Sequence, residues 1–558
     1  MNKEIKGYEY IHGTHTSAPN TLDDLIVVKE KIHYTDGTYA PNVRLIENFE
    51  RPFWVTLDKY RNHKDKKVWE QKNRLREFSS TQRRLKDAVS RALKKPGSDL
   101  GLRQLARSPY LYGIDIPVTS LVKKRYMDKY PDCISPSKTV AVLDIETDVV
   151  KGTNDIICIT LSFKDKVVVA ITKEFIGTIP DPINKLHLAA TKHLKELIES
   201  RKMNIEFRIL DNSALCCAHV FKRANEWKPD FIAIWNMNYD LPRIKKAVEA
   251  YGLRMEDLVS DEKVPVEFRK YNYVEGPAQK ITSSGDVSTL APYERWHVVY
   301  STSSYFFVDA MCVYYRIRLG DGKVVGGYGL DNTLKNHGLG GKLKLVPEVD
   351  NNYVKLRWHF EMQNRFKLEY ILYNIYDCVG MELLDEKTGD IRSTMPLLCE
   401  VSDLGRFKSN PRKLADDMHF ECLSHGYVIA SFSDNFITED DKAVGGADGI
   451  TVTLAAHQID DNGLELFDEL PGVRSNLRLG VSDLDIEGTY PRIQEKMNIA
   501  QDTTRKELVS VEGYIQHQFR MIGIDITGGS TNAWEIASKV MGFPDPIQLL
   551  DAFMQDHS

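Results

Sequence analysis

Residues 139–146 read TVAVLDIE, an apolar run that ends in two carboxylates separated by one residue. The apolar part predicts a buried strand, and two further β-rich runs follow at 156–163 and 167–171. Downstream the pattern alternates, with a helix near 189–200, a strand at 205–210, a helix near 213–227 and a strand at 231–235. Three strands followed by alternating helices and strands predict a mixed sheet with helices on its faces, an α/β fold.

Length and composition place the chain among large folded proteins. It has 558 residues, 42% hydrophobic and 27% charged, so three or four domains are expected. No apolar run is long enough to cross a bilayer, and the polar start MNKEIKGYEY is unlike a secretory signal. The eight cysteines include no CxxC pair and no zinc-ligand spacing, which favours a reducing compartment. The expected location is the cytoplasm, or the host cytoplasm if the protein is viral.

The net charge of −5 hides a strongly basic stretch. Between Lys59 and Arg125 there are 19 Lys or Arg residues against 6 Asp or Glu residues. Apolar residues recur at helical spacing from Leu85 to Leu93, and Pro96–Gly97 would stop this helix. The basic residues that predict a nucleic-acid-binding surface are Arg83, Arg84, Lys86, Arg91, Lys94 and Lys95. The same pattern also fits a solvated helical face.

Carboxylates that lie far apart along the chain are candidate metal ligands. Asp144 and Glu146 are two residues apart at the end of the predicted strand, so both side chains leave the same face. Two acids there are costly to bury unless a cation binds them, although a strand end that turns into solvent would also explain them. Asp240 follows the strand at 231–235 and precedes Leu241–Pro242, a position that also fits a helix N-cap.

Residues 366–378, FKLEYILYNIYDC, are apolar on most sides and predict a buried helix. Tyr373 and Asp377 are four residues apart in it, which places the phenol and the carboxylate on one face. A tyrosine in such a helix is commonly a core residue, but a buried aspartate is harder to explain without a cation. Hydrolysis of a phosphodiester by two divalent ions needs such a cluster of acids, and magnesium prefers their oxygen atoms.

Three short motifs, taken in order, resemble the exonuclease motifs of family B DNA polymerases. They are DIET at 144–147, NMNYD at 236–240 and YNIYD at 373–377. The resemblance implies a ribonuclease H-like fold of the DEDDy type, in which four acids hold two magnesium or manganese ions and a tyrosine orients the attacking water. Carried over by position, the metal ligands are Asp144, Glu146, Asp240 and Asp377, and the water-positioning residue is Tyr373. The second motif has two residues between Asn236 and its aromatic, where the family usually has three.

The resemblance to phage-type members extends on both sides of these motifs. Residues 33–56 and 112–126 look like the family's N-terminal domain. The span 269–299 lies where the family places a hairpin that separates primer from template. Asp309 and the segment 328–345, YGLDNTLKNHGLGGKLKL, match the second half of the exonuclease domain.

Two later segments resemble parts of the polymerase itself. AVGGAD at 443–448 looks like the Y-x-G-G element that is linked to moving the primer end between sites. DIEGTYPR at 485–492 resembles polymerase motif A, in which Asp485 would bind catalytic metal and Tyr490 would exclude a ribose 2′-hydroxyl. Neither the K-x-x-x-N-S-x-Y-G helix of motif B nor the D-T-D-S turn of motif C is found. We expect a split polymerase or a truncated sequence, which polymerises only if a second chain supplies those motifs.

The predicted organisation has four parts. They are an N-terminal domain that contacts nucleic acid (1–138), an exonuclease domain (139–390), a connecting region that returns to the N-terminal domain (391–475) and a partial palm with motif A (476–558). Expected partners are DNA, as single-stranded 3′ ends and primer–template, and a second polymerase chain that could recruit a sliding clamp; no membrane is expected. Frayed ends should be preferred, because terminal bases must be unstacked. The aromatic residues that could stack on them, or equally be core residues, are Trp235, Tyr239, Tyr305 and Phe306.

Two other functions fit the sequence. DEDDy acids also occur in autonomous 3′–5′ exonucleases that act on DNA or RNA, and the motif A resemblance favours the polymerase interpretation over that one. A catalytically inactive nucleic-acid-binding regulator would use only the basic N-terminal region, and intact acids at all four positions argue against it. Magnesium-dependent release of nucleotides from a labelled 3′ end would separate an enzyme from a binding protein.

Overall fold

The computed structural model describes most of the first three quarters of the chain. Described are residues 3–431, apart from residue 65 and the segments 96–99, 282–286 and 320–325, together with residues 492, 496, 523–525 and 530–532. The expected helix stop at Pro96–Gly97, the element at 443–448, and both motif A residues, Asp485 and Tyr490, lie outside the described residues.

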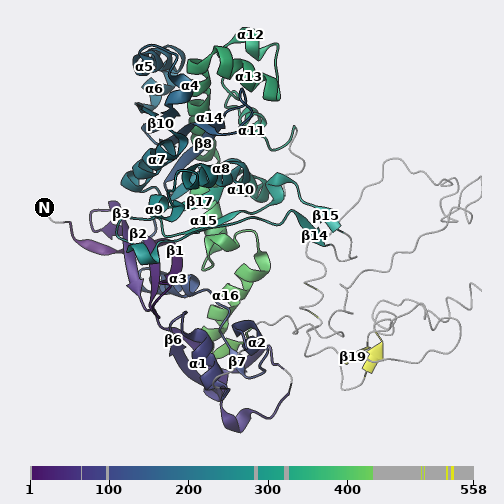
Figure 1. The fold of residues 1–558 in the computed structure, drawn as a ribbon. Coiled ribbons are helices and arrows are strands. Elements are labelled where there is room, and N and C mark those ends of the chain that lie inside the picture. Colours follow the sequence, from purple (N-terminus) through teal and green to yellow (C-terminus); the bar gives the residue numbers. More distant parts are fainter. Residues whose placement is uncertain are drawn as a thin grey trace, which may run out of the picture. The chain divides into compact units, whose positions relative to one another are not determined.

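The chain divides into two compact units, Met1–Phe436 and Ile437–Ser558. Figure 1 draws the chain as a ribbon with its elements labelled, coloured along the sequence as the bar of residue numbers shows. In the second unit, strand β19 (Gly523–Asp525) pairs antiparallel with β20 (Ser530–Asn532).

A six-stranded sheet with the order β11-β10-β9-β8-β12-β17 forms the centre of the first unit. Its strands are β8 (Val140–Thr147), β9 (Ile156–Phe163), β10 (Lys166–Thr172), β11 (Asn204–Leu210), β12 (Phe231–Ile234) and β17 (Phe306–Asp309). β9 runs antiparallel to β8 and β10, and the other neighbouring pairs are parallel. The predicted mixed α/β sheet is confirmed. Every residue of β9 is buried, because both faces of the sheet are covered.

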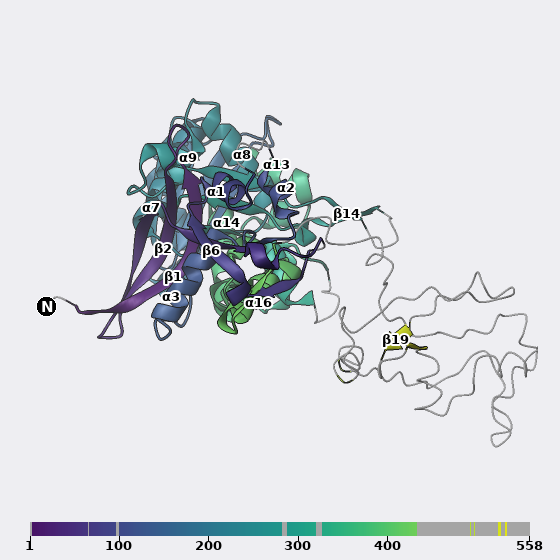
Figure 2. The same ribbon diagram turned by 90° about the horizontal axis from the view of Figure 1, so that it is seen from below.

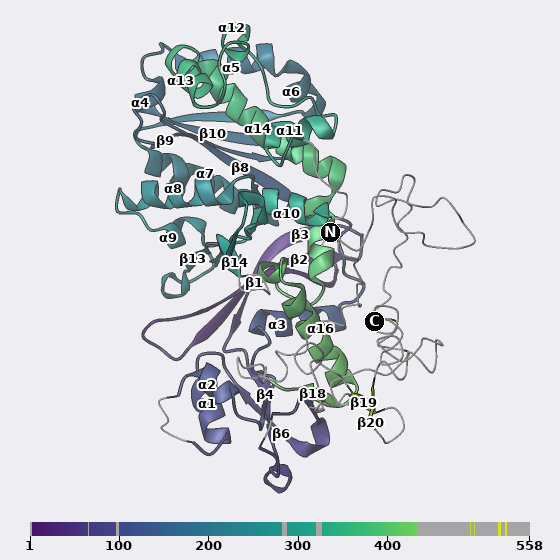
Figure 3. The ribbon, with the colours of Figure 1, turned by 90° about the vertical axis from the view of Figure 1, so that its right-hand side faces the viewer.

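Helices cover the two faces of this sheet (Figure 3). The odd-numbered residues of β8 from 141 to 145 join a core with α7 (Ser213–Trp227) and α8 (Met237–Glu249). The opposite face packs against α14 (Lys367–Thr388), flanked by α5 (Pro182–His193) and α10 (Ala310–Ile317). The even-numbered residues of β8 therefore point toward α14.

The prediction of a single helix near 189–200 is wrong. The chain forms α5 and then α6 (Lys195–Arg201), because Leu194 leaves helical geometry at φ −116° and ψ 21° and buries its side chain. Pro182 begins α5 earlier than expected, since its fixed φ suits the first helical turn.

Smaller helices complete this part of the molecule. They are α4 (Lys173–Ile176), α9 (Met255–Val259), α11 (Leu330–Asn336), α12 (Pro347–Asp350), α13 (Lys355–Arg365) and α15 (Met395–Cys399). Within the described residues, none of the helices is long and apolar enough to span a bilayer. Inside the span 269–299, β13 (Tyr271–Val274) pairs with β16 (Val298–Ser301), and β14 (Gln279–Ile281) pairs with β15 (Val287–Thr289).

The N-terminal strands form a separate antiparallel sheet. β1 (Ile5–Ser17), β2 (Asp24–Tyr34) and β3 (Tyr39–Glu47) follow one another in space as in sequence, and α3 (Val118–Lys129) lies against β1 (Figure 2). A hydrophobic core that includes Ile26, Val28 and Leu121 holds the helix to the sheet.

A third sheet has the order β6-β4-β7, from β4 (Arg51–Thr56), β6 (Leu75–Ser80) and β7 (Leu111–Tyr112). The helices α1 (Leu85–Ala92) and α2 (Leu102–Ala106) cover one of its faces. After α16 (Asn410–Ser424), β18 (Tyr427–Ile429) pairs with β5 (Trp69–Gln71). The segment of α16 and β18, up to residue 431, thus returns to the N-terminal part of the chain.

The basic helix is shorter than the sequence predicted. Leu85 and Val89 are buried as expected, but α1 ends at Ala92. Two residues later Lys94 adopts a left-handed φ of 60°, which is incompatible with a continued helix. Only Lys86 and Arg91 of the six basic residues lie within it. All six side chains are exposed.

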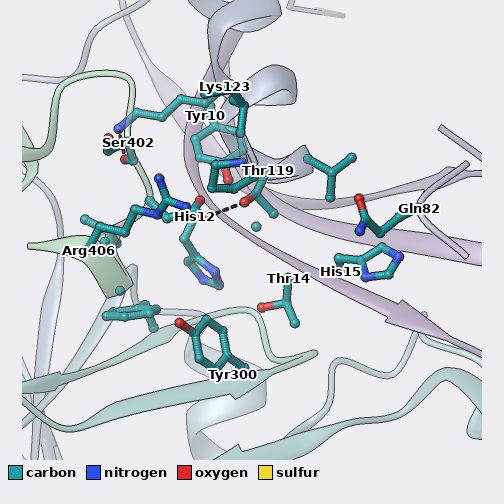
Figure 4. Close-up of a pocket in the computed structure, with 18 of the residues that line it drawn as sticks. Tyr10, His12, Thr14, His15, Gln82, Thr119, Lys123, Tyr300, Ser402 and Arg406 are labelled. Atoms are coloured by element: carbon teal, nitrogen blue, oxygen red, sulfur yellow. Dashed lines mark hydrogen bonds between the residues drawn. The ribbon is translucent and has the colours of Figure 1, made fainter. Parts of the chain in front are cut away.

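A cavity of about 350 Å³ lies where β1, the start of α3 and the segment after α15 meet (Figure 4). His12, Thr14 and Tyr300 point into it, with Arg406 and Lys123 at one side. Neither ring nitrogen of His12 has a hydrogen-bond partner among the described residues, and burial lowers its pKa to about 3. The acids singled out from the sequence do not line this cavity.

Candidate metal centre

β8 carries two of the predicted acids on the face that meets α14. The strand continues through both residues to Thr147, so the interpretation as a strand end in solvent is wrong. Glu146 is buried and Asp144 is partly buried. Their side chains share one face because strand residues two apart point the same way.

The predicted helix at 366–378 is part of α14, which carries Tyr373 and Asp377 one turn apart, both buried. Asn374, between them, ties the helix to the sheet. Its Nδ2 donates to Asp144 Oδ2 at 2.6 Å, and its Oδ1 accepts a hydrogen bond from the Thr160 hydroxyl. The helix is therefore held in register with the carboxylates of β8.

Three of the predicted acids come together at this junction. One carboxylate oxygen each from Asp144, Glu146 and Asp377 lies within 4.8 Å of the other two. Three clustered oxygen donors of this kind could hold a metal ion.

Asp240 lies outside this group of three but is coupled to it. It sits in the first turn of α8, whose N-cap is Asn236, so Asp240 is not the cap that the sequence also allowed. Its side chain is 3% exposed. Burial and the charges of Asp144 and Glu146 raise its pKa well above the ordinary value. The fourth acid therefore lies in the electrostatic field of the cluster.

The cluster carries a charge that is costly in the folded protein. Burial and Asp377 raise the pKa of Asp144 to about 7, and burial and Asp144 raise the pKa of Glu146 to about 8. Burial also raises the pKa of Asp377. Oxygen Oδ1 of Asp377 is buried with no hydrogen-bond partner among the described residues. A bound cation would offset these costs.

Lys342 supplies a positive charge at this cluster, and sequence reasoning did not single it out. Its Nζ lies 2.6 Å from Asp377 Oδ2 and also donates to the Tyr373 hydroxyl. Burial opposes the charge, but Asp377 and Tyr373 outweigh it and raise the pKa of Lys342 well above the ordinary value. The residue lies in the segment 328–345, directly after Gly340 and Gly341. This position after two glycines is the sequence signal that could have identified it.

The backbone around Lys342 is built from glycine. Gly340 and Gly341 have φ values of 85° and 90°, which side chains other than glycine rarely adopt. A Cβ on Gly341 would also lie 2.7 Å from Asp331 Oδ1, the atom that accepts the Lys342 backbone N–H at 2.7 Å. This turn fixes where the lysine side chain begins.

A second layer of side chains surrounds Glu146. Tyr370 donates a hydrogen bond to Glu146 Oε2 and is contacted in turn by Gln363 and His359 from α13. The Tyr370 ring stacks on Tyr373 with 6.1 Å between centroids. Tyr370, Tyr373 and Asp377 are spaced i, i+3, i+7, so helical periodicity could have identified Tyr370, whereas His359 and Gln363 gave no such signal.

The aromatic residues proposed to stack on bases divide into two groups. Tyr305 and Phe306 are core residues, 0% and 9% exposed, which is the alternative that the sequence left open for them. Trp235 is partly buried, and its indole N–H donates to the Tyr328 carbonyl at 3.2 Å. Tyr239 lies next to the acids, with its hydroxyl 2.9 Å from the Thr147 hydroxyl.

A large hollow lies just beyond Thr147, the last residue of β8, and none of the four acids lines it. It has a volume of about 880 Å³ and is lined by Asp148 and Gln363, which flank the end of β8, and by Arg243 and Lys246 from α8. The Arg243 guanidinium lies 3.5 Å from the centre of the Tyr239 ring. The hollow is thus lined by the partly exposed Arg243 and the exposed Lys246, and Arg243 also contacts the Tyr239 ring.

The remaining predicted site residues lie elsewhere. The basic residues lie in and beside α1, the helix that packs on the third sheet. The Lys94 ammonium pairs with Asp58 at 2.8 Å. Asp309 is the N-cap of α10, where its side chain accepts the Cys312 N–H at 3.2 Å. The structure thus brings together Asp144, Glu146 and Asp377 and leaves the basic residues apart from them.

Comparison with known proteins adds no assignment. No protein-family model matches the chain, and no curated protein sequence matches it. The chemistry of the cluster therefore has to be argued from its residues.

Proposed function

We propose that residues 139–390 form a ribonuclease H-like 3′–5′ exonuclease of the DEDDy type, the proofreading part of a phage-type family B DNA polymerase. One observation carries this proposal. Carboxylates of Asp144, Glu146 and Asp377, from β8 and the distant helix α14, approach within 4.8 Å of one another. Buried acids of like charge are expected where a protein binds cations for chemistry.

Two magnesium or manganese ions would be held by Asp144, Glu146, Asp240 and Asp377. The residues fit such ions because all donors are oxygen atoms, and because the unpartnered Asp377 Oδ1 would gain a ligand. When bound, the ions would activate a water and stabilise the leaving 3′ oxygen.

Tyr373 acts as a hydrogen-bond donor. Burial raises the pKa of its phenol well above the ordinary value, so the hydroxyl keeps its proton at neutral pH. Lys342 donates to the phenol oxygen, and the phenol itself hydrogen-bonds the Asp377 carboxylate. Its proton would turn to the attacking water, and orient it, when that carboxylate holds a metal ion.

Lys342 has a related role. Its ammonium group has three protons, and two of them go to Asp377 and Tyr373. The third proton would be donated in a hydrogen bond to an oxygen of the phosphate that is cleaved, and the charge of the ammonium group would offset the negative charge there. This places the lysine between the tyrosine, the third acid and the substrate.

The substrate is a single-stranded or frayed 3′ end, and the hollow beside Thr147 is its path. Arg243 and Lys246 would contact phosphates there, and the half-buried Tyr239 is the aromatic residue that remains for stacking on a base. A paired duplex end would first have to be opened.

The polymerase assignment rests on the motif A resemblance at Asp485 and Tyr490. Polymerisation would require a partner chain that carries motifs B and C. Primer–template extension by the full chain with and without that partner tests this part separately from the exonuclease.

The exonuclease is tested with a 5′-labelled single-stranded DNA, magnesium and the full chain. We expect stepwise shortening from the 3′ end by the wild type, none by an Asp144→Ala/Glu146→Ala variant, and normal shortening by Glu262→Ala, whose side chain is 84% exposed. Equal rates for wild type and double variant would refute the assignment. Faster cleavage of RNA than of DNA of the same sequence would favour an autonomous exonuclease, and binding without cleavage would favour the inactive regulator.

A further inference from the structure

Glu146 is held by a phenol from outside the cluster. The Tyr370 hydroxyl donates to Glu146 Oε2, and the Tyr370 side chain is completely buried. The carboxylate of Asp144, by comparison, is held by the amide of Asn374. Each of the two acids on β8 thus has its own donor on α14.

The hydrogen bonds around Tyr370 define the direction of its proton. A phenol has one proton and two lone pairs. The proton goes to the carboxylate of Glu146, so the phenol oxygen accepts from its two other neighbours, Gln363 Nε2 at 3.1 Å and His359 Nδ1 at 2.8 Å. His359 is therefore the tautomer that carries its proton on Nδ1.

Gln363 is itself fixed by the strand that carries Glu146. Its Nε2 also donates to the Thr147 carbonyl at 2.8 Å, and its Oε1 accepts the Val149 N–H at 3.0 Å. The residue is 2% exposed. Helix α13 is thereby tied both to Tyr370 and to the backbone directly after Glu146.

The rings leave Tyr370 little freedom to turn. Its ring is nearly parallel to that of Tyr373, with an interplanar angle of 11°. Trp358 and His359 contact it from α13, with centroids 6.0 and 5.8 Å away. Removing the hydroxyl while keeping the ring would therefore leave this packing in place.

We propose that Tyr370, held by Gln363 and His359, is a positioning residue that orients the Glu146 carboxylate for a divalent ion. This inference rests on the proposed function, because it assumes that Glu146 is a metal ligand. Hydrogen bonds to a metal ligand fix its orientation, and their loss typically weakens metal affinity by about 10–100-fold. Tyr370 acts only through Glu146 and does not touch the substrate.

The test compares two matched variants of the full chain. Tyr370→Phe removes the phenol that reaches Glu146, and Tyr376→Phe removes a phenol on the same helix that donates to the Leu339 carbonyl at 3.4 Å. Manganese binding is measured by calorimetry without DNA. We expect the dissociation constant of Tyr370→Phe to rise by about tenfold or more, and that of Tyr376→Phe to stay at the wild-type value.

Two further readouts separate positioning from a general loss of structure. The cleavage rate of Tyr370→Phe should recover at saturating manganese, with an unchanged KM for single-stranded DNA. A rate that stays low at saturating manganese, or a wild-type manganese affinity in Tyr370→Phe, would overturn the inference.

Asp144→Asn serves as the reference for the centre as a whole. If it loses manganese while Tyr370→Phe binds normally, the positioning role is wrong and the proposed function stands. If both variants bind manganese like the wild type, the metal centre itself is wrong and both proposals fall.

Discussion

Two regions of the molecule bury several ionisable side chains, and their charges are balanced very differently. In the N-terminal sheet, Lys29, Glu30 and Lys31 are consecutive residues of β2 and are 0–2% exposed. The Lys31 ammonium pairs with Asp230 at 2.7 Å, and Glu30 pairs with Arg44 at 2.8 Å. Lys29 donates to the Lys228 carbonyl at 2.8 Å. Here each buried charge has a partner of opposite sign or a carbonyl.

The acidic cluster has the opposite composition. Asp144, Glu146, Asp240 and Asp377 lie together in one electrostatic field, in which Lys342 pairs with Asp377 and Arg243 acts on Asp240 from further away. Paired buried charges hold two parts of a protein in register, whereas buried charges of like sign cost stability unless a ligand neutralises them. The contrast indicates that the first region is structural and that the second could hold a metal ion.

The largest effect is expected for Asp144→Asn. This variant keeps the shape of the side chain but removes a metal ligand. The exonuclease rate should therefore fall by about a thousandfold, the upper end of the range for removing one group that stabilises a transition state. Its free energy of unfolding without metal should stay equal or increase, because one like charge disappears. Loss of activity together with loss of stability would place Asp144 among structural residues instead.

Lys31→Met should produce the reverse pattern. It leaves Asp230 buried without its ion pair, which typically costs about 3–5 kcal/mol of unfolding free energy in urea titrations. The rate of the remaining folded protein should not change. The control is Lys3→Met, at a surface pair with Asp36 whose loss should hardly change the free energy of unfolding. Equal costs for both variants would remove the distinction between the two regions.

The pH dependence of stability should reveal the unbalanced charge. The pKa values of about 7 for Asp144 and about 8 for Glu146 lie above the ordinary values. Their contribution to stability is therefore complete at low pH and is lost as the pH rises through these values. Without metal we expect unfolding free energy to fall by on the order of 2 kcal/mol between about pH 6 and about pH 9.

Saturating magnesium should flatten this decline, since a cation favours the ionised acids. An Asp144→Asn/Glu146→Gln variant should show a smaller decline over the same range, because two of the four buried carboxyl groups are gone. A wild-type profile that is flat without metal would show that the acids are already neutralised by the protein.

The smallest effect is expected at the basic surface. Arg84→Ala/Arg91→Ala should weaken binding of single-stranded DNA a few-fold and reduce the slope of log affinity against log salt by about one for each phosphate that the variant no longer binds. The cleavage rate at saturating DNA should be unchanged. An unaltered salt slope would identify these residues as a solvated face.

The sequence predicted what depends on local periodicity. The succession of strands and helices along the chain, the shared face of Asp144 and Glu146, and the pairing of Tyr373 with Asp377 on a buried helix all follow from side-chain alternation and helical spacing. These regularities hold because both elements are buried against each other.

What the sequence missed depends on tertiary contacts. Lys342 reaches Asp377 from a glycine turn, and His359 reaches Tyr370 from a neighbouring helix, so neither contact has a sequence period. Tyr305 and Phe306 were candidates for base stacking. Both are buried, because β17, which begins at Phe306, lies next to β12 in the central sheet. Local pattern identifies a residue's face, and only packing shows what that face meets.

The most direct test of the central claim is anomalous X-ray scattering from crystals of the full chain grown with manganese. We predict two manganese peaks between Asp144, Glu146, Asp240 and Asp377, about 2.0–2.2 Å from carboxylate oxygens, the distance range of small divalent ions with oxygen ligands. A cluster without manganese at saturating concentration, with the acids in the positions described, would contradict the account.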